Sequence, residues 1–288
     1  MDFAYCLSKL REQLEDYIKK YNINALVIGV SGGLDSAVNA VICNAVCEKI
    51  GIPFYSYYLN IGNMEEKREE RNRAENIGKC FTSNFTFIDL TEEYLTFRDA
   101  CETSRHAEYP TFEDKIRRGN IKARMRMTFL RDATQYYHGI GIDNTNYTEW
   151  QLGFFTKNDD MDLSPLADMW KSDEYRFAEF LLTTLKKDSE KEALQACIDA
   201  IPTDGLGITS SDLEQIGCKS YFDVDDILKT LIPLEEKKEC GIKEFDEKWK
   251  ELEIKYGVME VQKVWERHIN SEFKRKGRKT LKIYTNRF

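Results

Sequence analysis

Residues 31–36 of this 288-residue chain, Ser-Gly-Gly-Leu-Asp-Ser, place two hydroxyl groups, two glycines and a carboxylate side by side. Backbone N–H groups can converge on an anion at such a turn, and glycine lets the main chain approach a phosphate closely. The apolar run 25–30 before it predicts a buried strand, and the segment after it has helical spacing with a start at Asp35 or Ser36. A strand, a glycine turn and a helix N-terminus in this order predict a phosphate site.

The loop lacks the lysine of G-x-x-x-x-G-K-[ST], so it is not a Walker A loop. It resembles instead the pyrophosphate loop of the ATP pyrophosphatases, which cleave ATP between its α- and β-phosphates. That resemblance implies that Ser31, the two glycines and Ser36 hold the leaving pyrophosphate and that Asp35 holds Mg²⁺. An ordinary strand-to-helix turn is the alternative reading of the loop by itself.

A second carboxylate, Glu149, follows another candidate strand. Residues 138–142 are short and alternating, and the polar run 143–149 comes directly after them. In a parallel sheet, such residues lie on the rim at the carboxyl ends of the strands. Glu149 could join Asp35 at one metal, because Mg²⁺ commonly takes one or two carboxylates together with phosphate oxygens and water. Taken alone, Glu149 could equally be an exposed helix residue.

A local cluster of basic side chains occupies the helix expected over residues 113–137. Its members are Arg117, Arg118, Lys122, Arg124 and Arg126. A guanidinium group can bind a carboxylate or phosphate at two points, so the cluster could be an anion clamp. A solvated basic face is the ordinary alternative, and the cluster alone does not decide between them.

Strands and helices are expected to alternate along the first half of the chain. We expect strands over residues 25–30, 52–59, 85–90 and 138–142, and helices over 3–20, 64–79 and 113–137 as well as after the glycine loop. This order predicts an α/β fold with a doubly wound, mostly parallel sheet flanked by helices. No linker rich in Pro, Gly or Ser divides the chain, so we expect residues 1–288 to form a single domain.

The bulk properties exclude several classes of protein. A net charge of −8 does not favour non-specific binding of nucleic acid. No apolar run approaches the length of a membrane span, and we expect neither a membrane anchor nor a signal peptide. Eight scattered cysteines without a C-x-x-C pair favour reduced thiols, so we expect a cytoplasmic protein.

Several motifs, in the right order, together resemble NAD synthetase. The likeness runs from about residue 25 to 228 and resumes near 257. After the glycine loop come R-G-N-I-K-A-R-M-R-M at 118–127, G-F-F-T-K at 153–157, D-L-S-P-L at 162–166 followed by Lys171, P-T-D at 202–204 and F-K-R at 273–275. The second and third motifs are much more specific to this synthetase than the glycine loop.

The resemblance implies roles by position. The residues implied to bind ATP are Gly29, Val30, Ser31, Gly32, Gly33, Leu34, Asp35, Ser36, Asn144, Lys171 and Thr203. Those implied to bind Mg²⁺ are Asp35 and Glu149. Those implied to contact the dinucleotide substrate are Arg124, Lys157, Asp162, Phe273 and Lys274.

The chain also departs from the family pattern. Asn144 replaces a nucleotide-contacting threonine, Leu213 replaces a glutamate, and Phe273 replaces the histidine of H-K-R. The loop after Lys157 is two residues shorter than in the family. Residues at about 230–256 resemble an insertion, which we expect to be helical.

The resemblance implies an enzyme, a ligase that forms NAD from deamido-NAD, ATP and ammonia. AMP and pyrophosphate leave by way of an adenylated intermediate, and the family is typically homodimeric. Free ammonia is implied because no residues are left over for a glutaminase domain. The alternatives are another ATP pyrophosphatase, of the tRNA-thiolating or amidotransferase type, and a non-catalytic nucleotide-binding relative. No Ser/His or Cys/His pair suggests a protein nucleophile, so no catalytic residue is assigned.

Overall fold

A four-stranded parallel sheet forms the centre of the protein. The structure is a computed structural model that describes residues 2–102, 111–203, 205–236 and 242–276. The strands are β1 (Leu26–Gly29), β2 (Phe54–Asn60), β3 (Asn84–Asp89) and β4 (Ile140–Ile142), in the spatial order β3-β2-β1-β4. All three strand pairs are parallel, so the predicted sheet and fold class are confirmed.

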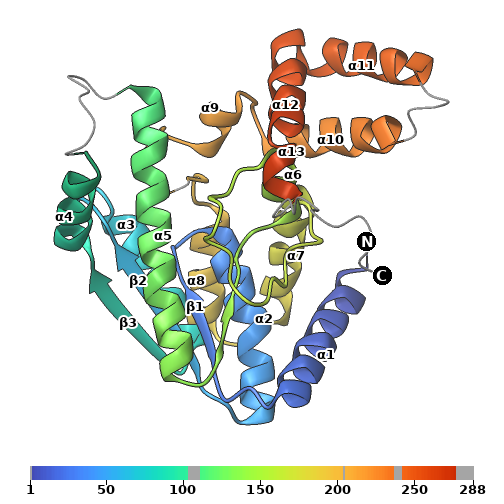
Figure 1. Ribbon diagram of the computed structural model, residues 1–288. Helices are drawn as coiled ribbons and strands as arrows, with labels where there is room; N and C mark the ends of the chain where they lie inside the picture. The colour runs from blue at the N-terminus through green and yellow to red at the C-terminus, as the bar shows by residue number, and fades with distance from the viewer. Residues whose placement is uncertain (1, 103–110, 204, 237–241, 277–288) are drawn as a thin grey trace, which may run out of the picture.

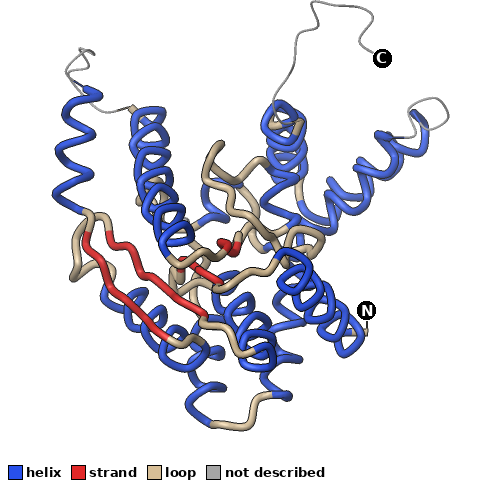
Figure 2. The backbone as a smooth tube through the Cα atoms, turned by 60° about the horizontal axis from the view of Figure 1, so that its bottom comes forward, coloured by secondary structure: helices blue, strands red, loops and turns tan. Residues whose placement is uncertain are grey.

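Helices cover both faces of the sheet (Figures 1 and 2). On one face, α2 (Leu34–Ile50) and α3 (Arg68–Phe81) pack on the strands, with α1 (Phe3–Tyr21), α7 (Lys171–Thr184) and α8 (Asp188–Ile198) outside them. On the other face lies α5 (Phe112–Tyr136), which follows α4 (Thr91–Glu102). The chain therefore changes faces between β3 and β4. As a result, the loops after β1 and β4 lie next to each other, where such sheets bind ligands.

Burial explains why these elements form. Every residue of β1 except Gly29 is buried, as expected for a strand covered on both faces. Helix α2 is apolar nearly all round and buried from Ser36 to Cys43, because the sheet lies on one side and other helices on the rest. In contrast, α1 buries the single stripe Leu7, Leu14 and Ile18.

Most of the remaining helices build a second apolar core at one end of the molecule. They are α6 (Tyr147–Leu152), α9 (Asp212–Ile216), α10 (Tyr221–Glu236), α11 (Ile242–Tyr256) and α12 (Val258–Asn270). The short helix α13 (Glu272–Arg275) follows them and buries no residue. Val224, Ile227, Leu228, Val261 and Val264 are fully buried there. Figure 1 shows α10, α11 and α12 together, away from β3 and α4. Of the insertion expected at 230–256, the described residues lie in α10 and α11, and residues 237–241 lie outside the described part.

The predicted elements of the first half are all present, with small shifts at their ends. The start of α2 differs from the prediction, because Gly33 is its N-cap and neither Asp35 nor Ser36 caps it. The hydroxyl of Ser36 is used inside the glycine loop instead. Among the described residues, no helix combines the length and apolar character needed to cross a membrane.

Candidate active site

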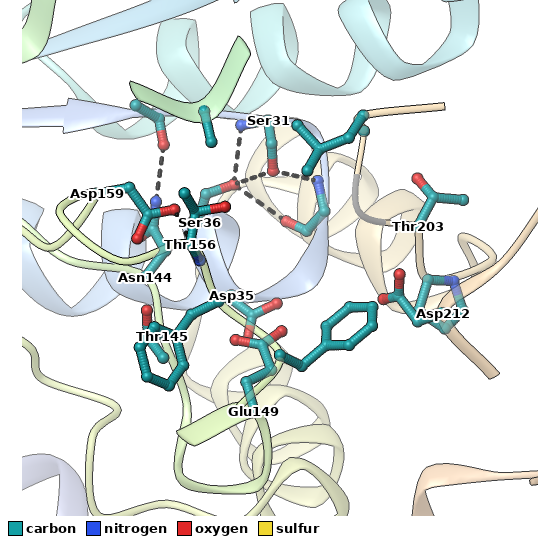
Figure 3. A pocket seen from close by; sticks show the side chains of 18 of the residues that line it. Ser31, Asp35, Ser36, Asn144, Thr145, Glu149, Thr156, Asp159, Thr203 and Asp212 are labelled. Carbon is teal, nitrogen blue, oxygen red and sulfur yellow. Dashed lines mark hydrogen bonds between the residues drawn. The ribbon is translucent and has the colours of Figure 1, made fainter. Parts of the chain in front are cut away.

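The glycine loop is closed by a pair of hydroxyl groups at the start of α2 (Figure 3). The Oγ atoms of Ser31 and Ser36 lie 3.3 Å apart, and the N–H of Ser31 donates to Ser36 Oγ at 3.2 Å. The N–H of Gly33 donates to Ser31 Oγ, also at 3.2 Å. The N-terminus of a helix favours negative charge, so this network presents hydroxyl and N–H groups where a phosphate would be stabilised.

Gly32 is required by both conformation and space. Its φ of +79° lies in the left-handed region, and a Cβ at this position would come within 2.3 Å of the carbonyl oxygen of Glu70. Arg73, also on α3, donates from Nε to the carbonyl of Gly32 at 2.8 Å. The loop is therefore held directly against α3, and any side chain at residue 32 would separate them.

Asp35 and Lys171 form a buried ion pair, with Lys171 Nζ 2.5 Å from Asp35 Oδ2. The amide of Asn146 donates to the other carboxylate oxygen at 2.7 Å. Burial alone would raise the pKa of Asp35, but the lysine and the amide outweigh it, so the pKa is lowered. Burial likewise opposes the charge of Lys171, and the nearby carboxylates reverse this and raise its pKa. Both groups are therefore charged.

Glu149 lies beside this ion pair, at the start of α6. Its backbone N–H bonds the side chain of Asn146 at 2.9 Å, and its carboxylate accepts from the N–H of Asn146, which forms a capping box. Figure 3 shows the side chains of Glu149 and Asp35 pointing toward one another. Burial, and then the charge of Asp35, raise the pKa of Glu149 well above its usual value.

Asp35 and Glu149 fit the requirements of Mg²⁺. Two oxygen-donor side chains converge next to a phosphate-binding loop, and their mutual repulsion is the reason that a cation would be favoured between them. In the part of the chain that the structure describes, no three His, Cys, Asp or Glu side chains form a metal cage. The arrangement therefore suits an ion that also takes phosphate oxygens and water rather than one held by protein alone.

The buried carboxylate of Asp225 fixes the backbone that carries Glu149 and Lys171. One oxygen accepts from the hydroxyl of Thr148 at 2.6 Å, and the other accepts from the backbone N–H of Ser172 at 2.7 Å. The N–H of Lys171 in turn donates to Thr148 Oγ1 at 2.8 Å. A residue on α10 thus joins the starts of α6 and α7, although it lies outside the cavity itself.

A cavity of about 570 Å³ opens over the glycine loop and the acidic group, a size that suits a nucleotide-like ligand. Most of the residues predicted to bind ATP line it: Gly29, Val30, Ser31, Gly33, Leu34, Asp35, Ser36, Asn144, Lys171 and Thr203. Asn144 also connects the loop after β4 to the end of β1 and to α2. Its amide donates to the carbonyl of Gly29 at 2.9 Å, and its oxygen accepts from Asn39 at 3.0 Å. Asp204 of the P-T-D motif lies outside the described residues.

The residues predicted to contact the dinucleotide do not all lie in the cavity. Lys274 lines the cavity, where its ammonium group donates to the carbonyls of Gly153 and Phe155 at 2.6 and 2.7 Å. Arg124 lines a separate hollow, and its Nε donates to the carbonyl of Lys157 at 3.1 Å. The ammonium of Lys157 lies 5.7 Å from the centre of the Phe273 ring. None of these contacts tests whether the residues bind the dinucleotide, so their roles stay predictions.

Asp162 makes contacts that stabilise the fold. One carboxylate oxygen accepts from the guanidinium of Arg131, and the other accepts from the N–H of Gly141 at 2.8 Å. These bonds hold the loop after Lys157 against α5 and β4. The side chain does not line the cavity, and a role in binding substrate remains a prediction.

Comparison with known proteins agrees with this geometry. The sequence matches the family model described as NAD synthase over residues 6–277. The chain belongs to the NAD synthase family. The NH(3)-dependent NAD(+) synthetase of Mesoplasma florum is 28% identical over 216 residues, which cover 74% of this chain and 84% of that protein. The enzyme of the same name from Methanocaldococcus jannaschii is 27% identical over 226 residues, covering 77% and 79%.

Solved structures show the same fold. The NMN synthetase of Francisella tularensis aligns with a TM-score of 0.72 and 24% identity over 98% of this chain and 99% of that one. The NH3-dependent NAD synthetase of Campylobacter jejuni aligns with a TM-score of 0.68 and 20% identity over 98% and 100%. The resemblance to NAD synthetase drawn from the motifs is therefore confirmed at the level of family and fold.

Three acidic residues near the site of this NAD synthase family member were not predicted from the sequence. Glu174 lies against Lys171, Asp212 accepts from the hydroxyl of Tyr221 at 3.2 Å at the edge of the cavity, and Asp159 lines the cavity. The spacing of Glu174, one turn after Lys171 on a helix, was the available signal for the first. The signal for Asp212 was its match to the first residue of a D-E pair of the family, whose second residue is replaced by Leu213. Nothing local marks Asp159, because its burial depends on segments distant in sequence.

We expect Asp225→Asn to lower the free energy of unfolding by about 1–3 kcal/mol. The amide can replace one acceptor oxygen, but its NH₂ group then faces a donor, either the hydroxyl of Thr148 or the N–H of Ser172. Urea unfolding measures the change. Asp223→Asn is the control, because Asp223 lies on the same helix and its side chain makes no hydrogen bond with any other described residue. This change should stay within about 0.5 kcal/mol of wild type. Equal effects of the two changes would contradict the joining role of Asp225.

A pH-dependent prediction follows from Asp159. Burial, and then Asp143, raise its pKa to about 7, whereas an aspartate in the unfolded chain titrates near 3.9. The folded protein thus retains a proton that the unfolded chain releases. This contribution to stability is complete below about pH 4 and is lost as the pH rises through about 7.

Asp159→Asn keeps the side chain neutral, so its melting temperature should rise relative to wild type between pH 5 and pH 8. Thermal unfolding at several pH values measures this difference. The exposed Asp168 provides the control change to Asn, whose difference from wild type should not vary with pH in this range. A pH-independent difference for Asp159→Asn would show that the raised pKa is wrong.

Proposed function

We propose that this chain catalyses the ATP-dependent amidation of deamido-NAD by ammonia, giving NAD, AMP and pyrophosphate. The observation that carries the proposal is the cluster of Asp35, Glu149 and the buried Lys171 beside a hydroxyl-lined glycine loop, in a chain that belongs to the NAD synthase family. The reaction and the ligase class predicted from the sequence agree with the relatives of the same name.

The chemistry divides into two displacements. The nicotinate carboxylate attacks the α-phosphorus of ATP. The bond between this phosphorus and the oxygen that bridges the α- and β-phosphates then breaks, and pyrophosphate is released. Ammonia then attacks the adenylated carbonyl carbon, AMP leaves with the electron pair of the broken C–O bond, and ammonia gives up a proton. Both steps develop charge on phosphate oxygens, so positioned donors contribute more than a nucleophile would.

The residues of the chain suit these steps. Ser31, Ser36 and the N–H groups of the loop would hold the departing pyrophosphate. Lys171 would turn from Asp35 to a phosphate oxygen, since its buried ammonium group needs a negative partner in either position. Mg²⁺, when bound by Asp35 and Glu149, neutralises phosphate charge.

Recognition of the pyridine nucleotide is proposed for Arg124, Lys157, Asp162, Phe273 and Lys274. Lys274 has the strongest support, because it lines the cavity with its ammonium group on carbonyls that a ligand could replace. A homodimer and a cytoplasmic location are further parts of the proposal. The seven described cysteines are all free thiols, in keeping with that location.

The direct test is incubation with Mg·ATP, ammonium and deamido-NAD, followed by identification of the products. We expect NAD, AMP and pyrophosphate in equal amounts, and no pyrophosphate without the pyridine nucleotide. A parallel reaction with nicotinate mononucleotide is informative, because NMN synthetase has the same fold. Faster turnover of the mononucleotide would change the substrate but not the reaction, and ATP binding without any pyrophosphate release would indicate a non-catalytic relative.

We expect Asp35→Asn and Glu149→Gln each to lower kcat by about 10²–10³-fold, the scale for losing one group aimed at developing charge. Both changes keep the size of the side chain and remove a charge. Asp168→Asn, an exposed change in the loop before α7, should leave kcat unchanged. Unchanged turnover and Mg²⁺ dependence in Glu149→Gln would remove Glu149 from the metal site.

A further inference from the structure

Glu174 is a fully buried carboxylate that none of the proposed chemistry uses. It lies on α7 one helical turn after Lys171, and its exposed fraction is 0%. A carboxylate in such a place is unfavourable unless a charge or hydrogen bonds compensate it. Its presence at this position therefore needs a partner close at hand.

That partner is the ammonium group of Lys171. Glu174 Oε2 lies 3.1 Å from Lys171 Nζ, on a lysine that also contacts Asp35 at 2.5 Å. Within the described ranges of the chain, neither oxygen of Glu174 has a hydrogen-bond donor in suitable geometry. Burial, and then the charge of Asp35, raise the pKa of Glu174 well above its usual value, and the ammonium group of Lys171 acts against both. The contact with Lys171 is therefore the one that offsets its burial in part.

The two carboxylates that contact Lys171 differ in what else they can reach. Asp35 begins α2 beside the glycine loop, points toward Glu149 and lines the cavity. Glu174 is not among the residues that line the cavity. A cation that enters from the cavity therefore meets Asp35 first, and Glu174 stays with the lysine.

We propose that Glu174 is a positioning residue for Lys171, keeping a carboxyl group against the buried ammonium group while Mg²⁺ replaces the lysine at Asp35. Lys171 is then released from Asp35 without losing its last carboxyl contact, and it can turn to an ATP phosphate from a fixed place. This inference rests on the proposed function, since it assumes that Mg·ATP binds at Asp35 and the glycine loop.

The test is calorimetric titration of ATP into wild type and Glu174→Gln, with Mg²⁺ and with EDTA, in the absence of pyridine nucleotide. Without Glu174, the divalent cation must displace the last carboxylate from Lys171. We expect the affinity for Mg·ATP to fall about 10-fold and kcat to fall about 10–100-fold, the scale for groups that orient a site from behind. The affinity for metal-free ATP should not fall, because no cation then displaces Lys171 from Asp35.

Asp173→Asn is the matched control, since Asp173 is the preceding residue of α7 and pairs with Arg176 and Lys229 on its outer side. It should leave both affinities unchanged. If Glu174→Gln weakens ATP equally with and without Mg²⁺, or changes neither affinity, the proposal is wrong. If the wild type binds Mg·ATP but forms no amide, only the proposed function is wrong. The role of Glu174 can still be tested, because this titration needs no turnover.

Should Glu174→Gln fail to fold, the test moves to Lys171→Gln and the double variant Lys171→Gln/Glu174→Gln. A residue that acts only through Lys171 has no further effect on Mg·ATP affinity or kcat once the lysine is gone. Equal values for the two variants support the proposal, and a further loss of 5-fold or more in the double variant overturns it.

Discussion

The buried ion pair between Asp35 and Lys171 connects two regions of the chain that lie 136 positions apart. One is the strand and glycine loop that carry Asp35, and the other is α7, which begins at Lys171. Removing Lys171 would leave two carboxyl groups, those of Asp35 and Glu174, without the positive charge between them, which costs far more than losing a surface contact. The glycine loop, α6 and α7 are therefore arranged around a charge that the cavity exposes to ligand.

Much of this arrangement could be predicted because its signals are local. The apolar run before Ser31, the glycines after it and the alternation of strands and helices each depend on neighbouring residues. Parallel strands must bring their carboxyl ends to one edge, so Asp35 and Glu149 could be placed together without any structure. Lys171 was identified only by resemblance, since no pattern along the chain distinguishes it from other lysines.

The contacts that hold the site in place could not be predicted, because each joins segments distant in sequence. Asp225 is one of several acidic residues in its helix, and only the packing of α10 on α6 and α7 reveals its bonds. Asp162 was expected at the substrate, and its bonds to Arg131 and Gly141 became visible only with the fold. The start of α2 was misplaced for a different, local reason, since the hydroxyl of Ser36 has partners within the loop and is not free to cap the helix.

The two hydrogen bonds of Asp225 also determine which neighbouring positions are free to vary over evolution. At residue 148 the carboxylate is bound by a side-chain hydroxyl, so threonine can be exchanged for serine, whereas valine would fit the space but leave the carboxylate without that donor. At residue 172 the carboxylate is bound by the main chain, so this bond tolerates any side chain except proline, which has no N–H to donate. The same buried acid thus restricts residue 148 to two residue types, whereas at residue 172 it excludes only proline, and the side chain there is limited by its own burial and its contact with Lys229.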